Sequence, residues 1–253
     1  MAIPKKIHYC WFGGNPLNKR TLRYIERWKE LCPDFEFIRW DETNCDMNAN
    51  EYVRGAYQSG KWAFVSDYFR LKALYEQGGV YLDTDVELLR PFGDLLELSG
   101  FAGFEDAEHV ATCVLGAEKE HGFFRQAMEL YEGRTFLREG GEPDLTTNVE
   151  ILTSLLGRNG LEPDGARQSV MGMEIFPAEY FSPRSLETGK LTKTGNTYAI
   201  HWFEASWQTG SQRFHRKVAQ VIGKKNTERL KKLLGRSGAV SYTHLTLPTI
   251  CSV

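Results

Sequence analysis

Apolar and polar positions in the first forty residues predict a strand, a helix and a second strand. Residues 5–14, KKIHYCWFGG, offer apolar side chains on both faces of a strand that closes on two glycines. Residues 18–33 have helical periodicity and end at a proline. The apolar stripe predicted for this helix consists of Leu22, Ile25, Trp28 and Leu31. A second strand at 35–40 completes an order that is typical of a parallel α/β sheet.

The following segments predict a long helix that leads into a third strand. Residues 43–60 are polar and indicate a connection with one short helix. The longer helix at 62–77, WAFVSDYFRLKALYEQ, is ended by Gly78. One of its stripes is polar and contains Ser66, Asp67 and Arg70. The strand VYLDTDVEL follows at 80–88.

Shorter elements are predicted after residue 100. The pattern indicates strands at 101–106 and 110–119, helices at 121–133 and 144–160, an irregular aromatic segment at 173–183, and a strand running into a loop at 197–207. We therefore expect one α/β domain over residues 1–212, with a Rossmann-like, mostly parallel central sheet flanked by helices.

Two C-terminal segments differ from this domain. Residues 213–236 carry nine Lys or Arg and a single acid, Glu228. Such a basic amphipathic segment either lies on an anionic membrane surface as a peripheral contact or packs on the domain as a solvated helix. Residues 237–253 are nearly uncharged and resemble a translated sequencing-adapter tail. We expect this tail to be non-native or disordered, and the alternative is a genuine terminal strand.

Composition narrows the class of protein. Of the 253 residues, 42% are hydrophobic and 25% charged, as in ordinary globular proteins. A net charge of −2 gives no reason to expect nucleic acid as a partner. Five cysteines without CxxC spacing predict separate thiols in a reducing compartment. The sequence shows neither an apolar signal region nor an apolar run of membrane-spanning length, so we expect a cytoplasmic protein with at most peripheral contact at the inner face of the membrane.

The candidate chemistry lies in GGVYLDTDVEL, residues 78–88. In a continuous strand, Asp83 and Asp85 point to the same face, where two unpaired carboxylates repel and are costly to bury. A divalent cation removes this cost, and hard oxygen ligands suit Mg²⁺ or Mn²⁺, whose remaining coordination positions a diphosphate fills. Parallel α/β sheets place such sites at the carboxyl ends of strands. The alternative for an isolated pair of this kind is a solvated turn.

Three blocks carry a family resemblance: IPKKIHYCWFGGNP, AFVSDYFRLKALYEQGGVYLDTDVEL and IHWFEASW. Together they resemble the DXD-containing sugar transferases of glycosyltransferase family 32, which include capsular polysaccharide synthesis enzymes and relatives of initiating mannosyltransferases. The resemblance runs from Ile3 to Trp207. It implies a GT-A fold, a nucleotide-diphosphate sugar as donor, Mn²⁺ or Mg²⁺ as cofactor, and retention of anomeric configuration.

The resemblance also assigns roles to residues of the central block. Asp83 and Asp85 match the DXD pair that binds the metal and the donor diphosphate. Ser66, Asp67 and Arg70 match the S-D-x-x-R element, which contacts the sugar or ribose of the donor. These residue types suit that role, because aspartate accepts hydrogen bonds from hydroxyl groups and arginine donates several in a fixed fork. The alternative for Asp67 and Arg70 is a surface ion pair.

The two flanking blocks supply further candidates. Trp11 and Phe12 match the position beside the nucleotide base, where a flat apolar side chain lines the base, and the alternative is ordinary core packing. His201 matches the third metal ligand of many GT-A enzymes, and imidazole is compatible with Mn²⁺. A lone histidine is otherwise a hydrogen-bonded structural residue, and Glu204 is the alternative ligand.

The remaining candidates concern the closing segment and the acceptor. Ser206 and Trp207 resemble a Ser-Trp pair that covers the donor diphosphate, where the indole N–H donates to an oxygen of the leaving group, against core packing as the alternative. Glu105 and Asn148 are expected in a loop and at a helix start, where they face either the acceptor or only solvent.

These residues predict a metal-dependent, retaining hexosyltransferase that acts on a hydroxyl of a glycan or lipid-linked glycan, in bacterial surface or capsular polysaccharide synthesis. The expected catalytic residues are Asp83, Asp85, Arg70 and Trp207. Retention is expected to proceed by attack from the leaving-group face. Two alternatives stay open, a non-catalytic module that binds nucleotide sugars or glycans, and a DxD phosphotransferase of the haloacid dehalogenase type.

Overall fold

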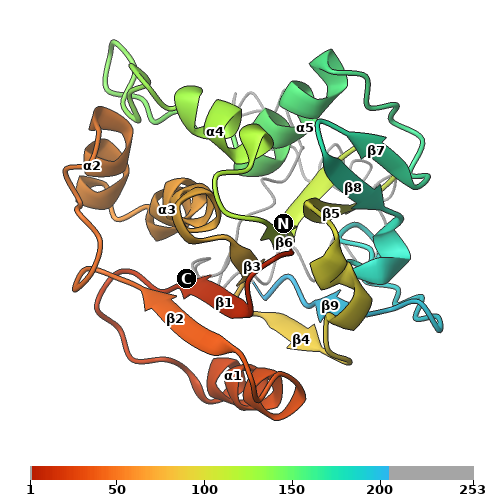
Figure 1. Cartoon of the computed structure of the whole chain (residues 1–253). Coiled ribbons are helices and arrows are strands. Elements are labelled where there is room, and N and C mark those ends of the chain that lie inside the picture. The colour runs from red at the N-terminus through yellow and green to blue at the C-terminus, as the bar shows by residue number, and fades with distance from the viewer. Residues whose placement is uncertain (1, 205–253) are drawn as a thin grey trace, which may run out of the picture.

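The computed structural model describes residues 2–204, and a seven-stranded sheet forms its centre (Figure 1). The basic segment 213–236, the tail 237–253, Ser206 and Trp207 lie outside the described residues, so the predictions made for them stay predictions. Within residues 2–204, we find no helix with both the length and the apolarity needed to cross a bilayer.

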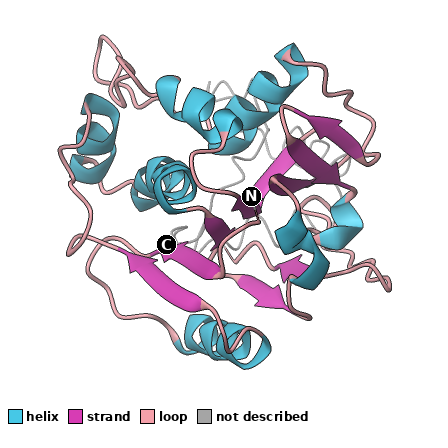
Figure 2. Ribbon diagram, in the orientation of Figure 1, coloured by secondary structure: helices cyan, strands magenta, loops and turns pink. Residues whose placement is uncertain are grey.

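The described elements follow the α/β order predicted from periodicity (Figure 2). The strands are β1 (Lys6–Cys10), β2 (Glu36–Trp40), β3 (Gly79–Leu82), β4 (Val86–Leu88), β5 (Gly100–Phe104), β6 (Val110–Ala117), β7 (Gln168–Val170), β8 (Met173–Phe176) and β9 (Ala199–His201). The helices are α1 (Lys19–Leu31), α2 (Glu51–Gln58), α3 (Trp62–Gln77), α4 (Gly122–Glu129) and α5 (Asn148–Arg158), with short 3₁₀ turns η1 (Gly93–Glu97) and η2 (Ala178–Tyr180).

The main sheet has the order β2-β1-β3-β6-β5-β8-β7. Strands β1, β2, β3, β5 and β8 run in one direction, and β6 and β7 run in the opposite one. The predicted Rossmann-like, mostly parallel sheet is therefore confirmed. Its parallel strands bring their carboxyl ends to one edge, where sites of α/β proteins are expected.

The sheet separates two buried layers. Helices α3, α4 and α5 cover one face, and α2 packs on the outside of α3 (Figure 1). The other face is covered by η1, by α1 and by a second sheet in which β4 and β9 pair antiparallel. The four cysteines within residues 2–204 are free thiols, as the sequence predicts.

Two predictions about local structure are wrong. The buried stripe of α1 consists of Thr21, Tyr24, Ile25 and Trp28, whereas Leu22 is 44% exposed. The stripe is rotated because the indole N–H of Trp28 donates to the Val86 carbonyl of β4, which fixes the face that α1 presents. In addition, the aromatic segment 173–183 contains strand β8, which pairs parallel with β5.

Candidate active site

The DXD turn is the centre of the candidate site. The predicted strand 80–88 is interrupted, because β3 ends at Leu82 and β4 begins at Val86. The backbone N–H of Asp83 donates to Cys113 (2.9 Å), and that of Val86 donates back to the Asp83 carbonyl (3.0 Å). The expectation that Asp83 and Asp85 share one face of a continuous strand is therefore wrong. Instead, a tight turn brings both carboxylates together at the carboxyl end of β3.

Asp83 faces helix α3. Its carboxylate lies 3.5 Å from the Arg70 guanidinium, which is also 3.2 Å from Asp67. Arg70 donates to the Thr112 carbonyl (2.9 Å) and lies over the ring of Tyr81. Arg70, Asp67 and Asp83 are all buried, so the alternative of a surface ion pair is wrong. Burial raises the pKa of Asp67 to about 6, with Arg70 opposing this rise and Asp83 adding to it.

Asp85 faces strand β9. His201 pairs with Val86 across the β4–β9 ladder, and its Nε2 lies 3.2 Å from the Asp85 carboxylate. Burial disfavours a charged imidazole, but the Asp85 carboxylate outweighs it and holds the pKa of His201 well above its ordinary value. The negative charge that favours this proton equally favours a metal cation.

Asp83, Asp85 and His201 together form a donor set for a metal. Each presents one ligand atom within 4.8 Å of the others, and all three are buried. Two carboxylates and an imidazole suit Mn²⁺, and the oxygen ligands suit Mg²⁺. The residues therefore fit the divalent cation that the family resemblance implies.

His8 shows what a purely structural histidine looks like in this fold. It is as buried as His201, but its Nδ1 accepts from the Trp40 indole (3.1 Å), so its Nε2 donates to the Gly78 carbonyl (2.8 Å). Burial lowers its pKa to about 4, and the ring is neutral at physiological pH. The carboxylate facing His201, rather than burial, distinguishes it from a structural histidine.

Glu204 contributes through its backbone. Its N–H donates to the Asp85 carboxylate (2.8 Å), while its side chain lies 2.7 Å from Arg20 Nε and accepts from the Tyr24 hydroxyl (3.1 Å). Because α1 holds the Glu204 carboxylate, His201 is the side chain that joins the two aspartates. We call Arg20, Tyr24 and Glu204 the α1 clamp.

The α1 clamp was missed by sequence reasoning. Arg20 and Tyr24 precede Glu204 by about 180 residues, as the Tyr24–Glu204 separation shows. Neither belongs to a motif, and Arg20 is an ordinary charged residue on a predicted helix. The only local signal is Tyr24 beside Ile25, which widens the apolar stripe of α1 toward this side.

The other predicted donor residues lie around the same edge of the sheet. Trp11 and Phe12 directly follow β1 and are buried; the Trp11 indole donates to Asn15 (2.6 Å), and Phe12 packs on Phe69. The Ser66 hydroxyl donates to the Trp62 carbonyl within α3 (3.1 Å). Their contacts with a donor stay predictions.

The two acceptor candidates are buried, not solvent-facing. Glu105 follows β5 at the same sheet edge as the DXD turn. Asn148 is fully buried at the start of α5, where its amide accepts from the Tyr131 hydroxyl (3.0 Å) and donates to the Asp67 carbonyl (2.8 Å). Asn148 thus links α5 to the helix that carries Asp67, and an acceptor contact for either residue stays a prediction.

Comparison with known proteins identifies this region. The family model of the glycosyltransferase sugar-binding region containing a DXD motif matches residues 18–102. The chain carries a DXD-type glycosyltransferase region. The matched range includes α3 and the DXD turn, and it excludes Trp11 and His201. The predicted resemblance to DXD-containing sugar transferases is confirmed.

Proteins similar to the chain include two fungal mannosyltransferases. Inositol phosphoceramide mannosyltransferase 3 of Schizosaccharomyces pombe is 29% identical over 131 residues, which cover 50% of this chain and 36% of the relative. The initiation-specific alpha-1,6-mannosyltransferase of Candida albicans is 29% identical over 107 residues, which cover 38% of this chain and 28% of the relative. The matched parts thus span about a third of each relative.

The fold of the chain also has a solved counterpart. The PaToxG glycosyltransferase superposes with a TM-score of 0.51 at 15% identity, covering 62% of this chain and 69% of that one. At this identity the likeness concerns the fold alone. Together with the sheet order, it confirms the predicted GT-A fold.

Proposed function

We propose that the chain transfers a hexosyl group from a nucleotide-diphosphate sugar to a hydroxyl of a glycan or lipid-linked glycan. The observation that carries this proposal is the buried group of Asp83, Asp85 and His201 at the carboxyl edge of β3, with both aspartates inside the DXD region. The two mannosyltransferase relatives make GDP-mannose the first donor to test. A role in surface or capsular polysaccharide synthesis is part of the same proposal.

Asp83, Asp85 and His201 would hold the divalent cation. When bound, Mn²⁺ or Mg²⁺ supplies Lewis-acid stabilisation of the charge that develops on the leaving diphosphate. Arg70 places a permanent positive charge 3.5 Å from the Asp83 carboxylate, and the Glu204 N–H donates to the Asp85 carboxylate. These two contacts would hold both carboxylates in position in the absence of a ligand.

The donor's other parts are assigned to neighbouring side chains. Asp67 would accept hydrogen bonds from sugar or ribose hydroxyls, and Trp11 and Phe12 would line the base. Trp207 would donate its indole N–H to the leaving group. Retention of configuration, with attack from the leaving-group face, follows the family resemblance.

A donor panel with a nucleotide-release readout tests the proposal. GDP-mannose, UDP-galactose, UDP-glucose and UDP-N-acetylglucosamine are incubated with the protein in Mn²⁺, in Mg²⁺ and in chelator. We expect slow release from one donor, only with metal, and loss of release in Asp85→Asn. Asp34→Asn, an exposed carboxylate that pairs with Lys5, is the matched control. Equal release by wild type and Asp85→Asn would contradict the proposal, and donor binding without turnover would favour the binding-module alternative.

A further inference from the structure

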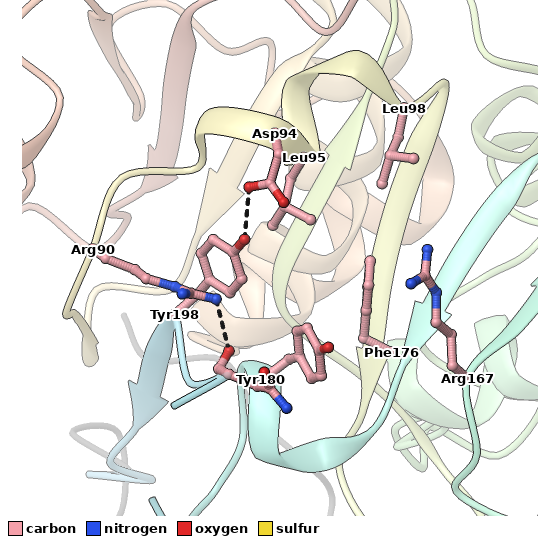
Figure 3. Close-up of a pocket in the computed structure, with 9 residues that line it drawn as sticks. Arg90, Asp94, Leu95, Leu98, Arg167, Phe176, Tyr180 and Tyr198 are labelled. Atoms are coloured by element: carbon pink, nitrogen blue, oxygen red, sulfur yellow. Dashed lines mark hydrogen bonds between the residues drawn. The ribbon is translucent and has the colours of Figure 1, made fainter. Parts of the chain in front are cut away.

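A second cavity lies away from the DXD turn, between η1, β8 and the segment that leads into β9 (Figure 3). Its volume is about 320 Å³, which is at the small end of the range for ligand pockets. Its lining includes Arg90, Asp94, Arg167, Phe176, Tyr180 and Tyr198. None of the candidate donor or metal residues lines it.

Three aromatic rings form a row along one wall of this cavity. Phe176 and Tyr180 stack with centroids 4.7 Å apart, and Tyr180 and Tyr198 are nearly parallel at 6.2 Å. A guanidinium covers each end of the row, Arg90 at 3.6 Å from the Tyr198 centroid and Arg167 at 4.8 Å from that of Phe176. The ring faces are therefore covered by one another and by the two guanidiniums, and the row presents its apolar edges to the cavity. Of the two guanidiniums, that of Arg167 also pairs with Glu174 (3.1 Å).

The polar groups of the cavity include both acceptors and donors. Tyr198 donates to Asp94 (2.8 Å), and burial together with Asp94 raises the pKa of Tyr198 to about 12, so the phenol stays protonated (Figure 3). Arg90 donates one N–H to the Asn196 carbonyl (3.1 Å). Its Nε is buried and has no hydrogen-bond partner among residues 2–204. The Arg90 guanidinium therefore keeps donor capacity beside the cavity.

The cavity is connected to the DXD turn by the β4–β9 ladder. Val86 pairs with His201 at one end, and the Leu89 N–H donates to the Tyr198 carbonyl at the other (2.8 Å). Tyr198 precedes His201 by three residues, which in an extended strand is roughly 10 Å. The cavity and the candidate metal site thus lie at opposite ends of the β4–β9 ladder.

We propose that this cavity binds a hexose unit that carries an anionic group. The apolar ring edges pack against the sugar, Asp94 accepts from its hydroxyls, and Arg90 selects for the negative charge. Assigning this unit to the acceptor or product glycan rests on the proposed function; binding at the cavity does not. A glycan held here would keep a growing chain at high effective concentration beside the transfer site.

Isothermal titration calorimetry with digalacturonate, the neutral disaccharide cellobiose, mannose 6-phosphate and inorganic phosphate tests the proposal. We expect the acidic sugars to bind about tenfold tighter than cellobiose. In Arg90→Gln, the affinity for the acidic sugars should fall by about tenfold, to that of cellobiose. Asp94→Asn, which removes the carboxylate that accepts from the sugar hydroxyls, should weaken binding of cellobiose while keeping the preference for the acidic sugars. The two acidic sugars distinguish a carboxylate from a phosphate as the preferred group.

Controls separate this site from the DXD site. Arg125→Gln removes an exposed charge on α4 and should bind like wild type. Asp85→Asn should also bind digalacturonate normally, even if no donor is ever turned over, so failure of the proposed function leaves this result intact. Equal binding of digalacturonate and cellobiose, of wild type and Arg90→Gln, or of phosphate and the acidic sugars would overturn the proposal, as would loss of binding in Asp85→Asn.

Discussion

Asp83 and Asp85 belong to one turn, yet they face two differently built sides of the molecule. Asp83 faces α3, where the buried Arg70 guanidinium lies 3.5 Å away. Asp85 faces β9, where it meets the imidazole of His201 and the backbone N–H of Glu204. One carboxylate therefore has a permanent cation beside it, and the other has a group that can release its proton and bind a metal.

This difference indicates that the two sides of the DXD turn have different roles, charge balance on the α3 side and metal binding on the β9 side. Arginine keeps its proton under all ordinary conditions, so Arg70 can balance charge but cannot ligate a metal. An imidazole can do either. We expect substitutions on the α3 side to lower mainly the stability of the fold, and substitutions on the β9 side to lower mainly the affinity for Mn²⁺.

The largest effect is expected for Arg70→Met. This change leaves Asp67 and Asp83 buried near each other without their shared cation, and breaking a buried ion pair in this way costs about 3–5 kcal/mol of unfolding free energy. Urea denaturation of the metal-free protein measures the loss.

Arg54→Met is the matched control for Arg70→Met. Arg54 is exposed on α2, where it pairs with Glu51, so its loss should change the unfolding free energy by less than about 0.5 kcal/mol. Adding Asp67→Asn to Arg70→Met should restore part of the stability, since it removes one uncompensated charge. A loss below about 1 kcal/mol for Arg70→Met would show that α3 does not stabilise the turn by charge.

The α3 side was largely predictable from sequence because it is local. Asp67, Arg70 and Asp83 lie within seventeen positions, on a helix and a strand whose periodicities are clear, and the connection between them is only Gly78. What the pattern could not show is that the strand stops at Leu82. Alternation continues through the turn, and the hydrogen bond from the Val86 N–H back to the Asp83 carbonyl, which closes the turn, leaves no mark in that alternation.

The β9 side could be predicted only through family resemblance. His201 reaches Asp85 because β9 pairs with β4, and no local pattern specifies that pairing across more than a hundred residues. The same limit explains why Leu22 was wrongly predicted to be buried. Its spacing alone fits an apolar stripe, but Trp28 and Tyr24 orient α1 through partners that are distant in the sequence. Asn148 has the right residue type for a surface helix start, yet Tyr131 and Asp67 hold it in the interior.

An intermediate effect is expected for His201→Asn. Loss of an imidazole from the donor set should lower the Mn²⁺ affinity by about 100-fold, the upper end of what changes around metal ligands produce. The unfolding free energy of the metal-free protein should fall by less than half of the Arg70→Met value. Electron paramagnetic resonance of free Mn²⁺ measures the first quantity, and urea denaturation the second.

His121→Asn makes the same change at a comparably hidden site away from the metal group. His121 caps α4, and asparagine preserves a capping side chain, so both Mn²⁺ affinity and stability should stay near wild type. If His121→Asn and His201→Asn bind Mn²⁺ equally well, the cation does not use the β9 side, and the division between the two sides fails.

The smallest effect is expected for Arg20→Gln, which loosens the α1 clamp without touching a ligand. Arg20 and Glu204 are partly exposed, so their pair contributes under about 1 kcal/mol, and Mn²⁺ affinity should fall only about threefold as the Glu204 N–H moves off Asp85. Arg27→Gln removes the same charge from the same helix, where Arg27 pairs with Glu30, and should leave Mn²⁺ binding unchanged. A threefold difference in Mn²⁺ affinity between these two variants would show that α1 helps to hold the Asp85 carboxylate through Glu204. Identical Mn²⁺ affinities would mean that the β4–β9 ladder alone holds Asp85. The position of Asp85 would then depend on strand pairing and not on contacts from α1.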